Sequence, residues 1–420
     1  MAMTEVTNES WFGRIGDSIK GVLFGLLLLV VACVVLFWNE GRAVREAQTI
    51  EEGRHSVVDA DPATLNPADE GKLVHVTGQA ATGETLADAV FGVSAPAVKL
   101  RRSAEMYQWQ EHKKERTEKK FGGGTQTVTT YTYDRTWSSQ PIDSANFREH
   151  DKVNPAEMPY HSETFTAHDV TLGAYRLTPS LLGQFDAWRS LAVGPASATA
   201  APAGPEATAT PPPAATPQVK GLQPRDGGYY LPRSAWAAAA GGAAAASSPA
   251  DVAMGGPQVG DVRIRFDVVR PGPVSVISRQ VKATFEPYQS KAGNTIDMLV
   301  AGTQSAEGMF KQRAATNRML TWALRAGGFV AMLIGFSLIF RPIAVLGDVV
   351  PFIGSLLGAG VFAISFGLSL CGSLVVIAVG WIVYRPLLGV ALLVAAAVVF
   401  FGLRSLAAGR RKGTTRTEMT

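Results

Sequence analysis

Cysteine is almost absent from this chain of 420 residues. The two cysteines, Cys33 and Cys371, both lie inside long apolar stretches. The polar middle of the chain therefore has no disulfide framework, no zinc cluster built on cysteine and no thiol nucleophile. The sequence also lacks a Gly-x-Ser-x-Gly elbow, a His-Glu-x-x-His pair, a phosphate-binding Gly-Lys-Ser/Thr loop and a dinucleotide fingerprint. We therefore expect a non-enzymatic protein without a cofactor.

Charged side chains are missing from a first apolar stretch, residues 21–38. A helix of these eighteen residues is about 27 Å long, close to the roughly 30 Å hydrocarbon core of a bilayer. The residues that follow, Asn39-Glu40-Gly41-Arg42, do not form the small-x-small pattern of a signal-peptidase site. We therefore predict an uncleaved signal anchor, transmembrane helix 1, at 21–38.

A second apolar part covers residues 326–403, which contain only three charged residues. We predict an amphipathic lead-in and transmembrane helix 2 at 305–341, an interfacial segment and transmembrane helix 3 at 349–383, and transmembrane helix 4 at 387–403. Proline removes a hydrogen-bond donor and clashes with the preceding turn, so Arg341-Pro342 is expected to end helix 2. As a single helix, 349–383 would be about 52 Å long; two short helices there, and five spans in all, remain an alternative.

Four spans would place both termini on one side of the membrane. Basic residues favour the cytoplasmic side, and Arg14 and the cluster Arg410-Arg411-Lys412 lie near the termini. We therefore predict a cytoplasmic N-terminus at 1–20, a cytoplasmic tail at 404–420 and an extracytoplasmic domain, periplasmic or lumenal, at 39–304.

The pattern of the middle segment predicts β-strands. Val262, Ile264, Phe266 and Val268 alternate with polar residues, as in a strand with one buried face. A short strand is expected at 73–77, and two long strands are expected at 98–109 and 125–137. The charged run 111–120 and a triple-glycine turn at 122–124 would connect the last two.

One helix and two insertions complete the predicted α+β domain. The helix should be capped by Thr178 or Ser180, with Pro179 in its first turn. Apolar residues follow at helical spacing: Leu181, Leu182, Phe185, Trp188 and Leu191. Residues 194–217 and 237–250 consist almost entirely of alanine, glycine, proline, serine and threonine. Such composition cannot bury enough apolar surface to offset the entropy of ordering, so both are expected to be disordered loops. The piece between them, 223–234, has aromatic residues that should dock on the domain.

Two candidate sites in the domain are weak. A metal site could use a local group of histidines and acidic residues, but the spacing matches no standard zinc pattern: His150, Asp151, His161, Glu163, His168 and Asp169. A nucleic-acid surface could use Lys99, Arg101 and Arg102 with nearby aromatic residues. Acidic residues are interleaved with these, so we expect a half-buried strand and no nucleic-acid partner, and we assign no metal ligand.

Basic residues near the predicted membrane boundaries are the better candidates for contact with lipid headgroups. On the domain's side of the membrane these residues are Arg42, Arg45, Lys311, Arg313 and Arg318. Inside the predicted spans there is no ionisable residue, which argues against an ion-coupled transporter.

The sequence resembles the transmembrane protein 43 (LUMA) family. The resemblance rests on motifs that occur in order along nearly the whole chain: Asn39-Glu40-Gly41-Arg42-Ala43, Pro96-Ala-Val-Lys-Leu-Arg-Arg102, Glu105-Met-Tyr-Gln-Trp109, Tyr131-x-Tyr133, Asn154-Pro155, Thr321-Trp322-x-Leu-Arg-Ala326 and Gly380-Trp-x-x-Tyr-Arg-Pro386. The two insertions depart from the family pattern.

The resemblance implies four spans, one large lumenal domain, self-association and no catalytic residue. For eukaryotic members it also implies the endoplasmic reticulum or inner nuclear membrane, with emerin and lamins as partners. The alanine-, glycine- and proline-rich composition, and the absence of N-glycosylation acceptors from 39–304, indicate a bacterial member in an inner membrane instead. We therefore expect a homo-oligomeric, membrane-organising scaffold that contacts the bilayer and other membrane proteins. The alternative is a lipid-binding or lipid-handling envelope protein.

Overall fold

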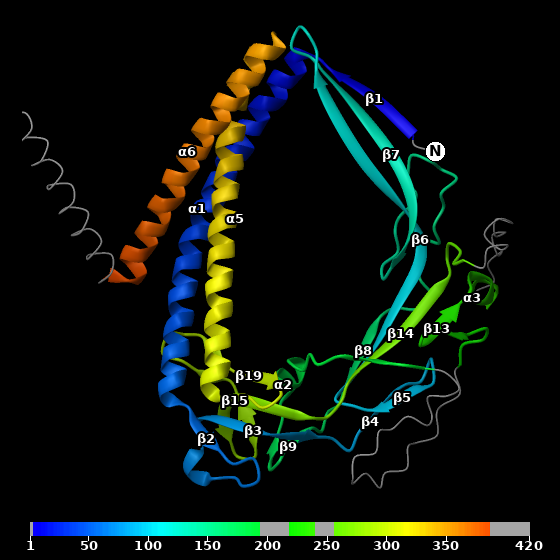
Figure 1. Cartoon of the computed structure of the whole chain (residues 1–420), viewed down its shortest axis with the longest axis vertical. Coiled ribbons are helices and arrows are strands. Elements are labelled where there is room, and N and C mark those ends of the chain that lie inside the picture. Colours follow the sequence, from blue (N-terminus) through cyan, green and yellow to red (C-terminus); the bar gives the residue numbers. More distant parts are fainter. Residues whose placement is uncertain (1–2, 194–217, 240–255, 387–420) are drawn as a thin grey trace, which may run out of the picture.

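The computed structural model describes residues 3–193, 218–239 and 256–386. Three long helices lie together along one side of the molecule, and β-strands form the rest (Figure 1). The helices are α1 (Trp11–Ser56), α5 (Ala306–Gly347) and α6 (Pro351–Tyr384), and each is long and apolar enough to cross a membrane. This confirms the predicted β-rich domain between an N-terminal and a C-terminal membrane helix region. The predicted helix 4 at 387–403 lies outside the described residues.

The helices are longer than the predicted spans. α1 does not stop where the apolar stretch ends but continues to Ser56. Pro342 lies inside α5, which runs on to Gly347, so the predicted end at Arg341-Pro342 is wrong. Membrane helices tolerate such a proline because neighbouring groups re-satisfy the freed carbonyl. α6 is a single helix of 34 residues, without a break between the predicted interfacial segment and span.

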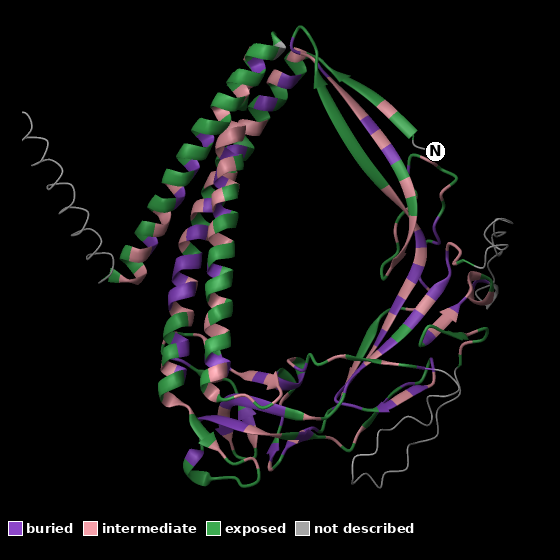
Figure 2. Cartoon of the chain, viewed as in Figure 1, coloured by how far each residue is buried: buried purple, intermediate pink, exposed green. Residues whose placement is uncertain are grey.

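Large apolar side chains are exposed along the helices, as a lipid-facing surface requires. Leu23 is 71% exposed and Val34 is 61% exposed on α1, and Leu356 is 66% exposed on α6. Figure 2 shows many exposed positions along α6, which lies on the side of the helices away from the β-strands. Where the helices meet, a small buried cluster of Ala32, Leu36 and Met332 joins α1 to α5. The apolar sequence and the exposure pattern thus agree.

Beyond the apolar stretches, α1 and α5 continue together as a two-helix stalk (residues 39–56 and 306–325) that ends on the β domain. Ile50 of α1 and Phe310 of α5 share a buried cluster with residues of the nearest sheet. Gly53 is required at this contact, because a Cβ there would lie 2.7 Å from the Phe310 ring. Polar contacts add to the joint: the Thr49 and Ser290 hydroxyls are 2.8 Å apart.

Glu46 links the stalk internally and should make its stability depend on pH. Its carboxylate accepts from Arg313 Nε at 2.6 Å and from Asn294 Nδ2 at 2.8 Å. Burial alone would raise the pKa of Glu46, but the Arg313 and Asn294 hydrogen bonds outweigh it and hold the pKa below the ordinary value of 4.5. Because the folded pKa is lowered, this stabilisation is present above pH 4.5 and is lost as the pH falls through the folded pKa. We expect Glu46→Gln to lower the melting temperature at neutral pH, and the difference from the unmodified chain to vanish in acid.

The first sheet has the strand order β1-β7-β6-β14-β13-β12, with β11 paired to β14 and β8 paired to β6. The strands are β1 (Met3–Glu9), β7 (Thr125–Ser138), β6 (Lys99–Lys119), β14 (Val262–Val269), β13 (Gly228–Leu231), β12 (Gln223–Arg225), β11 (Arg189–Leu191) and β8 (Glu163–Thr166). The predicted docking of the segment around residue 230 is confirmed, because β13 pairs directly with β14.

The second sheet has the order β19-β15-β16-β10-β9-β3-β2 and receives the stalk. Its strands are β19 (Met298–Ala301), β15 (Pro273–Val281), β16 (Thr284–Glu286), β10 (Tyr175–Arg176), β9 (Thr171–Leu172), β3 (Leu73–Ala81) and β2 (Val58–Ala60). Two small hairpins and three short helices complete the described chain: β4 (Thr85–Asp88) with β5 (Val93–Pro96), β17 (Tyr288–Gln289) with β18 (Thr295–Ile296), η1 (Pro67–Asp69), α2 (Pro179–Gly183) and α3 (Arg233–Ala239).

The main core brings both sheets together. Val262, Ile264, Phe266 and Val268 are all at most 1% exposed, which confirms the alternation predicted for β14. They share one buried cluster with residues of the second sheet such as Val276. Fully burying one such side chain contributes about 1.5–3 kcal/mol, so this cluster supplies the main stability of the domain.

Three predicted boundaries in the domain are wrong. The run 111–120 is not a connection, because β6 continues through it and pairs with β7 as far as Lys119 opposite Thr125. The strand predicted at 73–77 does not end there, since β3 reaches Ala81. The predicted helix after Pro179 is only α2, because the residues from Arg189 onward pair with β14 instead. The insertion 194–217 lies outside the described residues, as does most of 237–250, whose first residues end α3.

The β6–β7 hairpin reaches the far end of the helices and closes a ring (Figure 1). Its tip is the predicted glycine turn, where Gly122 and Gly123 have positive φ angles. Arg14 of α1 donates to the Gly123 carbonyl at 2.6 Å and pairs with Asp348, which Lys119 of β6 also contacts at 2.5 Å. We call these contacts, with the pairing of β1 to β7, the clasp. The clasp places the N-terminal segment beside the domain, whereas the predicted topology separates them by the membrane.

Candidate membrane-interface site

One carboxylate connects all three long helices at the domain-side end of the apolar stretches. Glu40 of α1 is 2% exposed. Arg325 of α5 donates to it twice, from Nε at 2.7 Å and from Nη2 at 2.8 Å, and Trp381 of α6 donates its indole N–H at 2.9 Å. A bidentate guanidinium–carboxylate pair fixes orientation as well as charge. We call this group of three residues the Glu40 junction.

The neighbouring polar residues of α1 are bound to α5 in the same layer. Arg42 donates to Asn317 Oδ1 at 2.9 Å and to Thr321 Oγ1 at 3.0 Å. Asn39 donates to the Thr321 carbonyl at 3.2 Å, and Asn317 in turn donates to the Ala43 carbonyl at 3.1 Å. The segment Asn39-Glu40-Gly41-Arg42 is therefore a helix-joining element.

Gly41 allows α6 to approach α1 in this layer. A Cβ at Gly41 would lie 2.6 Å from the Tyr384 ring. We expect Gly41→Ala to destabilise the helix bundle by about 1–3 kcal/mol, because the ring must shift. Thermal unfolding in detergent micelles measures this. Gly327→Ala on α5 is the matched control, since open space surrounds that position, and it should be neutral or slightly stabilising. Equal effects at both positions would contradict the role assigned to Gly41.

Two tryptophans flank the Glu40 junction. The Arg325 guanidinium lies 5.0 Å from the centroid of Trp322 and 5.7 Å from that of Trp381. Tryptophan is enriched at membrane–water interfaces, where its ring can face hydrocarbon and its N–H a polar group. The apolar stretch of α1 ends at Trp38, and that of α5 begins after Arg325. The junction therefore lies at the level of the lipid headgroups when these stretches cross a bilayer.

A groove of about 560 Å³ runs along the stalk from this layer toward the β domain. Its lining includes Lys311 and Arg318, which are two of the five basic residues predicted to contact the membrane surface, and both are exposed. Arg42 and Arg313 are instead held by intramolecular bonds to Asn317 and Glu46. Arg45 is half-buried on α1. Contact of these residues with lipid stays a prediction.

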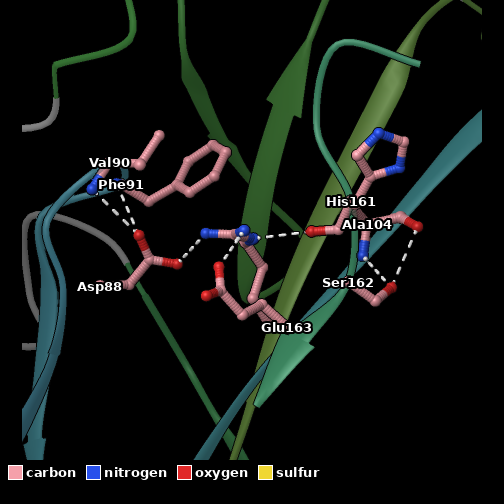
Figure 3. Close-up of polar contacts among 8 residues, drawn as sticks. Asp88, Val90, Phe91, Ala104, His161, Ser162 and Glu163 are labelled. Carbon is pink, nitrogen blue, oxygen red and sulfur yellow. Dashed lines mark hydrogen bonds and ion pairs between the residues drawn. The ribbon is translucent and has the colours of Figure 1, made fainter. Parts of the chain in front are cut away.

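The predicted metal candidates are not brought together. Within the described part of the chain, no group of three histidine, cysteine, aspartate or glutamate residues is placed to hold a metal ion. Glu163 accepts from Arg102 Nη2 at 2.8 Å, and Asp88 pairs with Arg102 Nη1 at 2.5 Å. His161 contributes its carbonyl to this arginine, while its ring points away from both carboxylates (Figure 3).

The basic residues that suggested a nucleic-acid surface belong partly to the interior. Arg102 and Lys99 are each 7% exposed. Lys99 donates to the Gly183 and Phe185 carbonyls at 2.7 and 3.0 Å, and burial lowers the pKa of its ammonium group. Arg101 stays partly exposed and stacks on Trp188 with a centroid distance of 4.3 Å. These side chains hold β6 against its neighbours.

Glu40, Arg325 and Trp381 each lie in one of the family motifs, but the sequence did not predict that they form one site. A signal was available: an acidic residue lies two positions after one apolar stretch, and a basic residue directly precedes another. Opposite charges at matching ends of two membrane helices favour pairing, because an unpaired charge there costs several kcal/mol.

Comparison with known proteins gives one consistent family. The family model described as "Transmembrane protein 43" matches residues 106–386. The mouse protein of that name is 32% identical over 398 residues, covering 91% of this chain and 90% of the relative. The human protein is 32% identical over 89% of this chain and 87% of its own length, and the Drosophila melanogaster homolog is 27% identical over 89% and 92%. No solved structure matches. The helix junction thus lies within a chain that belongs to the transmembrane protein 43 family.

Proposed function

We propose that this integral membrane protein is a non-enzymatic scaffold that organises the membrane through its β domain and through self-association. The observation that carries the proposal is an unbroken series of contacts that joins the membrane helices to the β domain. The Glu40 junction ties three helices at the headgroup level, and the stalk is bonded to the second sheet at its other end. A rigid connection of this kind holds a binding domain at a fixed height above the membrane.

Self-association has a candidate edge in β7. Its only neighbour besides β6, within the described residues, is β1 of the clasp, which covers Thr125–Tyr131. When the clasp opens, that edge presents unpaired N–H and C=O groups, which favour pairing with another strand. A second copy offers the same edge, and two such edges pair antiparallel about a twofold axis.

A single cysteine tests this directly. In a variant without Cys33 and Cys371, Val128→Cys at the middle of the covered edge should form a disulfide-linked dimer in native membranes under mild oxidation. Ala63→Cys in an exposed loop is the control and should stay monomeric. If chemical cross-linking also yields only monomer, and no other protein co-purifies, the scaffold proposal fails.

A second candidate function is lipid binding or handling in the envelope. The specific observation in its favour is the groove on the stalk, which combines exposed basic residues with tryptophans at the headgroup level. The lipids that co-purify with the chain measure this. A composition identical to that of the bulk membrane would remove the candidate.

A further inference from the structure

The groove beside the Glu40 junction has an unbalanced charge. Its lining contains five basic and two acidic side chains, which gives a net charge of +3. Glu40 is already neutralised by Arg325, and Glu51 lies 3.0 Å from His55. The remaining basic residues have no acidic partner within the described part of the chain: Arg54, Lys311, Arg318 and Arg385. The groove is therefore suited to an anion supplied from outside.

The distance of these residues from the headgroup level decides which of them can contact a lipid. At 1.5 Å per residue, Arg318 lies about 10 Å and Lys311 about 21 Å along α5 from Arg325. The headgroup layer on each side of the hydrocarbon core is roughly 5–7 Å thick. Arg385 directly follows α6 at this level. The long side chains of Arg318 and Arg385 can therefore reach a headgroup. Lys311 and Arg54 are too far for contact and only attract an anionic headgroup electrostatically.

The tryptophans of the groove define where the acyl chains would begin. Trp322 is 67% exposed, on the turn between Arg318 and Arg325, and Trp381 holds its indole N–H on Glu40. Both residues lie among exposed apolar side chains of α5 and α6, such as Leu320 and Val383. An amphipathic ligand would thus find cations at its polar end and apolar surface at the other. Guanidinium groups bind phosphate oxygens in a bidentate manner. The two arginines therefore favour a ligand that carries a phosphate over one with an uncharged polar headgroup.

We propose that the membrane end of this groove, formed by Arg318, Trp322, Trp381 and Arg385, binds the phosphate of an anionic phospholipid. The proposal rests on the lipid-binding candidate above and assigns it a site and a ligand class. The lipid enters laterally from the leaflet on the domain's side. Its phosphodiester lies between Arg318 and Arg385, and its acyl chains follow the exposed apolar faces of α5 and α6.

The test uses the full chain in nanodiscs of phosphatidylcholine containing a minority of phosphatidylglycerol, with bound lipid counted by native mass spectrometry. We expect phosphatidylglycerol to be enriched over its share of the bilayer. The double variant Arg318→Gln/Arg385→Gln should lose this enrichment by about fivefold per side chain, since one basic residue near a membrane contributes about 1 kcal/mol. Both residues lie outside the Glu40 junction, and an unchanged melting temperature confirms folding.

A matched control removes the same charge elsewhere: Arg176→Gln on β10 with Lys282→Gln in the turn between β15 and β16 should keep the enrichment. Equal loss in both double variants would overturn the site, because the effect would then be one of net charge. Enrichment that survives in the groove variant would also overturn the site, while leaving lipid binding in place. No enrichment in the unmodified chain would overturn both. Full displacement by inorganic phosphate would assign the groove to a soluble anion and contradict the lipid.

Discussion

Arg325→Ala is expected to destabilise the helix bundle by about 3–5 kcal/mol, the usual cost of leaving a buried charge without its partner. Glu40 would keep only the Trp381 indole as a donor, in a position that is 2% exposed. Unfolding of the full chain in neutral detergent micelles, followed by circular dichroism, measures the loss.

Two comparison variants separate the pair from a general effect of charge. Arg318→Ala removes an exposed arginine from the same helix and should change the unfolding free energy by no more than about 0.5 kcal/mol. Glu40→Gln/Arg325→Gln removes both charges and should recover part of the stability, because no uncompensated charge remains. A double variant whose loss of stability equals the losses of Glu40→Gln and Arg325→Gln added together would show that the two side chains act independently, against the junction.

Arg102→Ala is expected to have an effect of similar size in the β domain. Arg102 joins three elements: it pairs with Asp88 of β4, with Glu163 of β8, and stacks on Phe91 with a distance of 5.3 Å to the ring centroid. Asp88 is 1% exposed and would keep only the backbone N–H donors of Val90 and Phe91. Its buried carboxylate would have no counter-charge, at a cost of about 3–5 kcal/mol. Hydrogen exchange of the backbone amides near Phe91, together with the melting temperature, measures the local and the global effect.

The neighbouring residue supplies the control. Arg101→Ala removes a partly exposed ion pair to Asp267, for which about 0–1 kcal/mol is usual. A cost for Arg101→Ala equal to that for Arg102→Ala would contradict the distinction between the two sides of β6. Asp88→Asn should recover part of the loss in the Arg102→Ala background, because the neutral amide costs less to bury.

Short-range patterns explain which parts of the fold were predictable. The alternation in β14 repeats every two residues and directly reports one buried face. Charge-free stretches of sufficient length report membrane helices in the same way. The outer half of β6 has no buried face, because its residues from Glu111 onward are exposed or half-buried, so a charged strand resembled a loop. Its pairing with β7 is a tertiary interaction, which no local sequence pattern predicts.

The candidate site shows the same limit more strongly. Glu40 and Arg325 are 285 residues apart, and Glu40 and Trp381 are 341 residues apart. A single sequence does not show which of its distant residues are close in space. The placement of charges could therefore indicate a membrane boundary but not the partner of each charge. For the same reason Arg42, predicted to face lipid, is bound to Asn317 of another helix. Burial and pairing decide which basic residues remain available.

The clasp cannot stay closed when the long helices span a bilayer. The base of the β6–β7 hairpin lies in the domain, whereas its tip contacts Arg14, on the far side of the apolar stretch of α1. In a bilayer, the outer part of β6 would have to pass the hydrocarbon layer. Seven of the nine residues from Glu111 to Lys119 are charged, and each costs about 2.5–3.5 kcal/mol at the centre of a membrane. The hairpin must therefore leave α1 when the helices insert, which also frees the β7 edge proposed for self-association.

Membrane topology, measured by cysteine labelling in intact and permeabilised cells, tests this description most directly. Single cysteines replace Thr7, Phe121, Ser139 and Thr415 in a variant without Cys33 and Cys371. We predict that Phe121→Cys and Ser139→Cys react with an impermeant reagent from one side, and Thr7→Cys and Thr415→Cys only from the other. Reaction of Thr7→Cys and Phe121→Cys from the same side would show that the clasp stays closed in the membrane. Reaction of Ser139→Cys and Thr415→Cys from the same side would contradict the four-span topology on which the scaffold proposal depends.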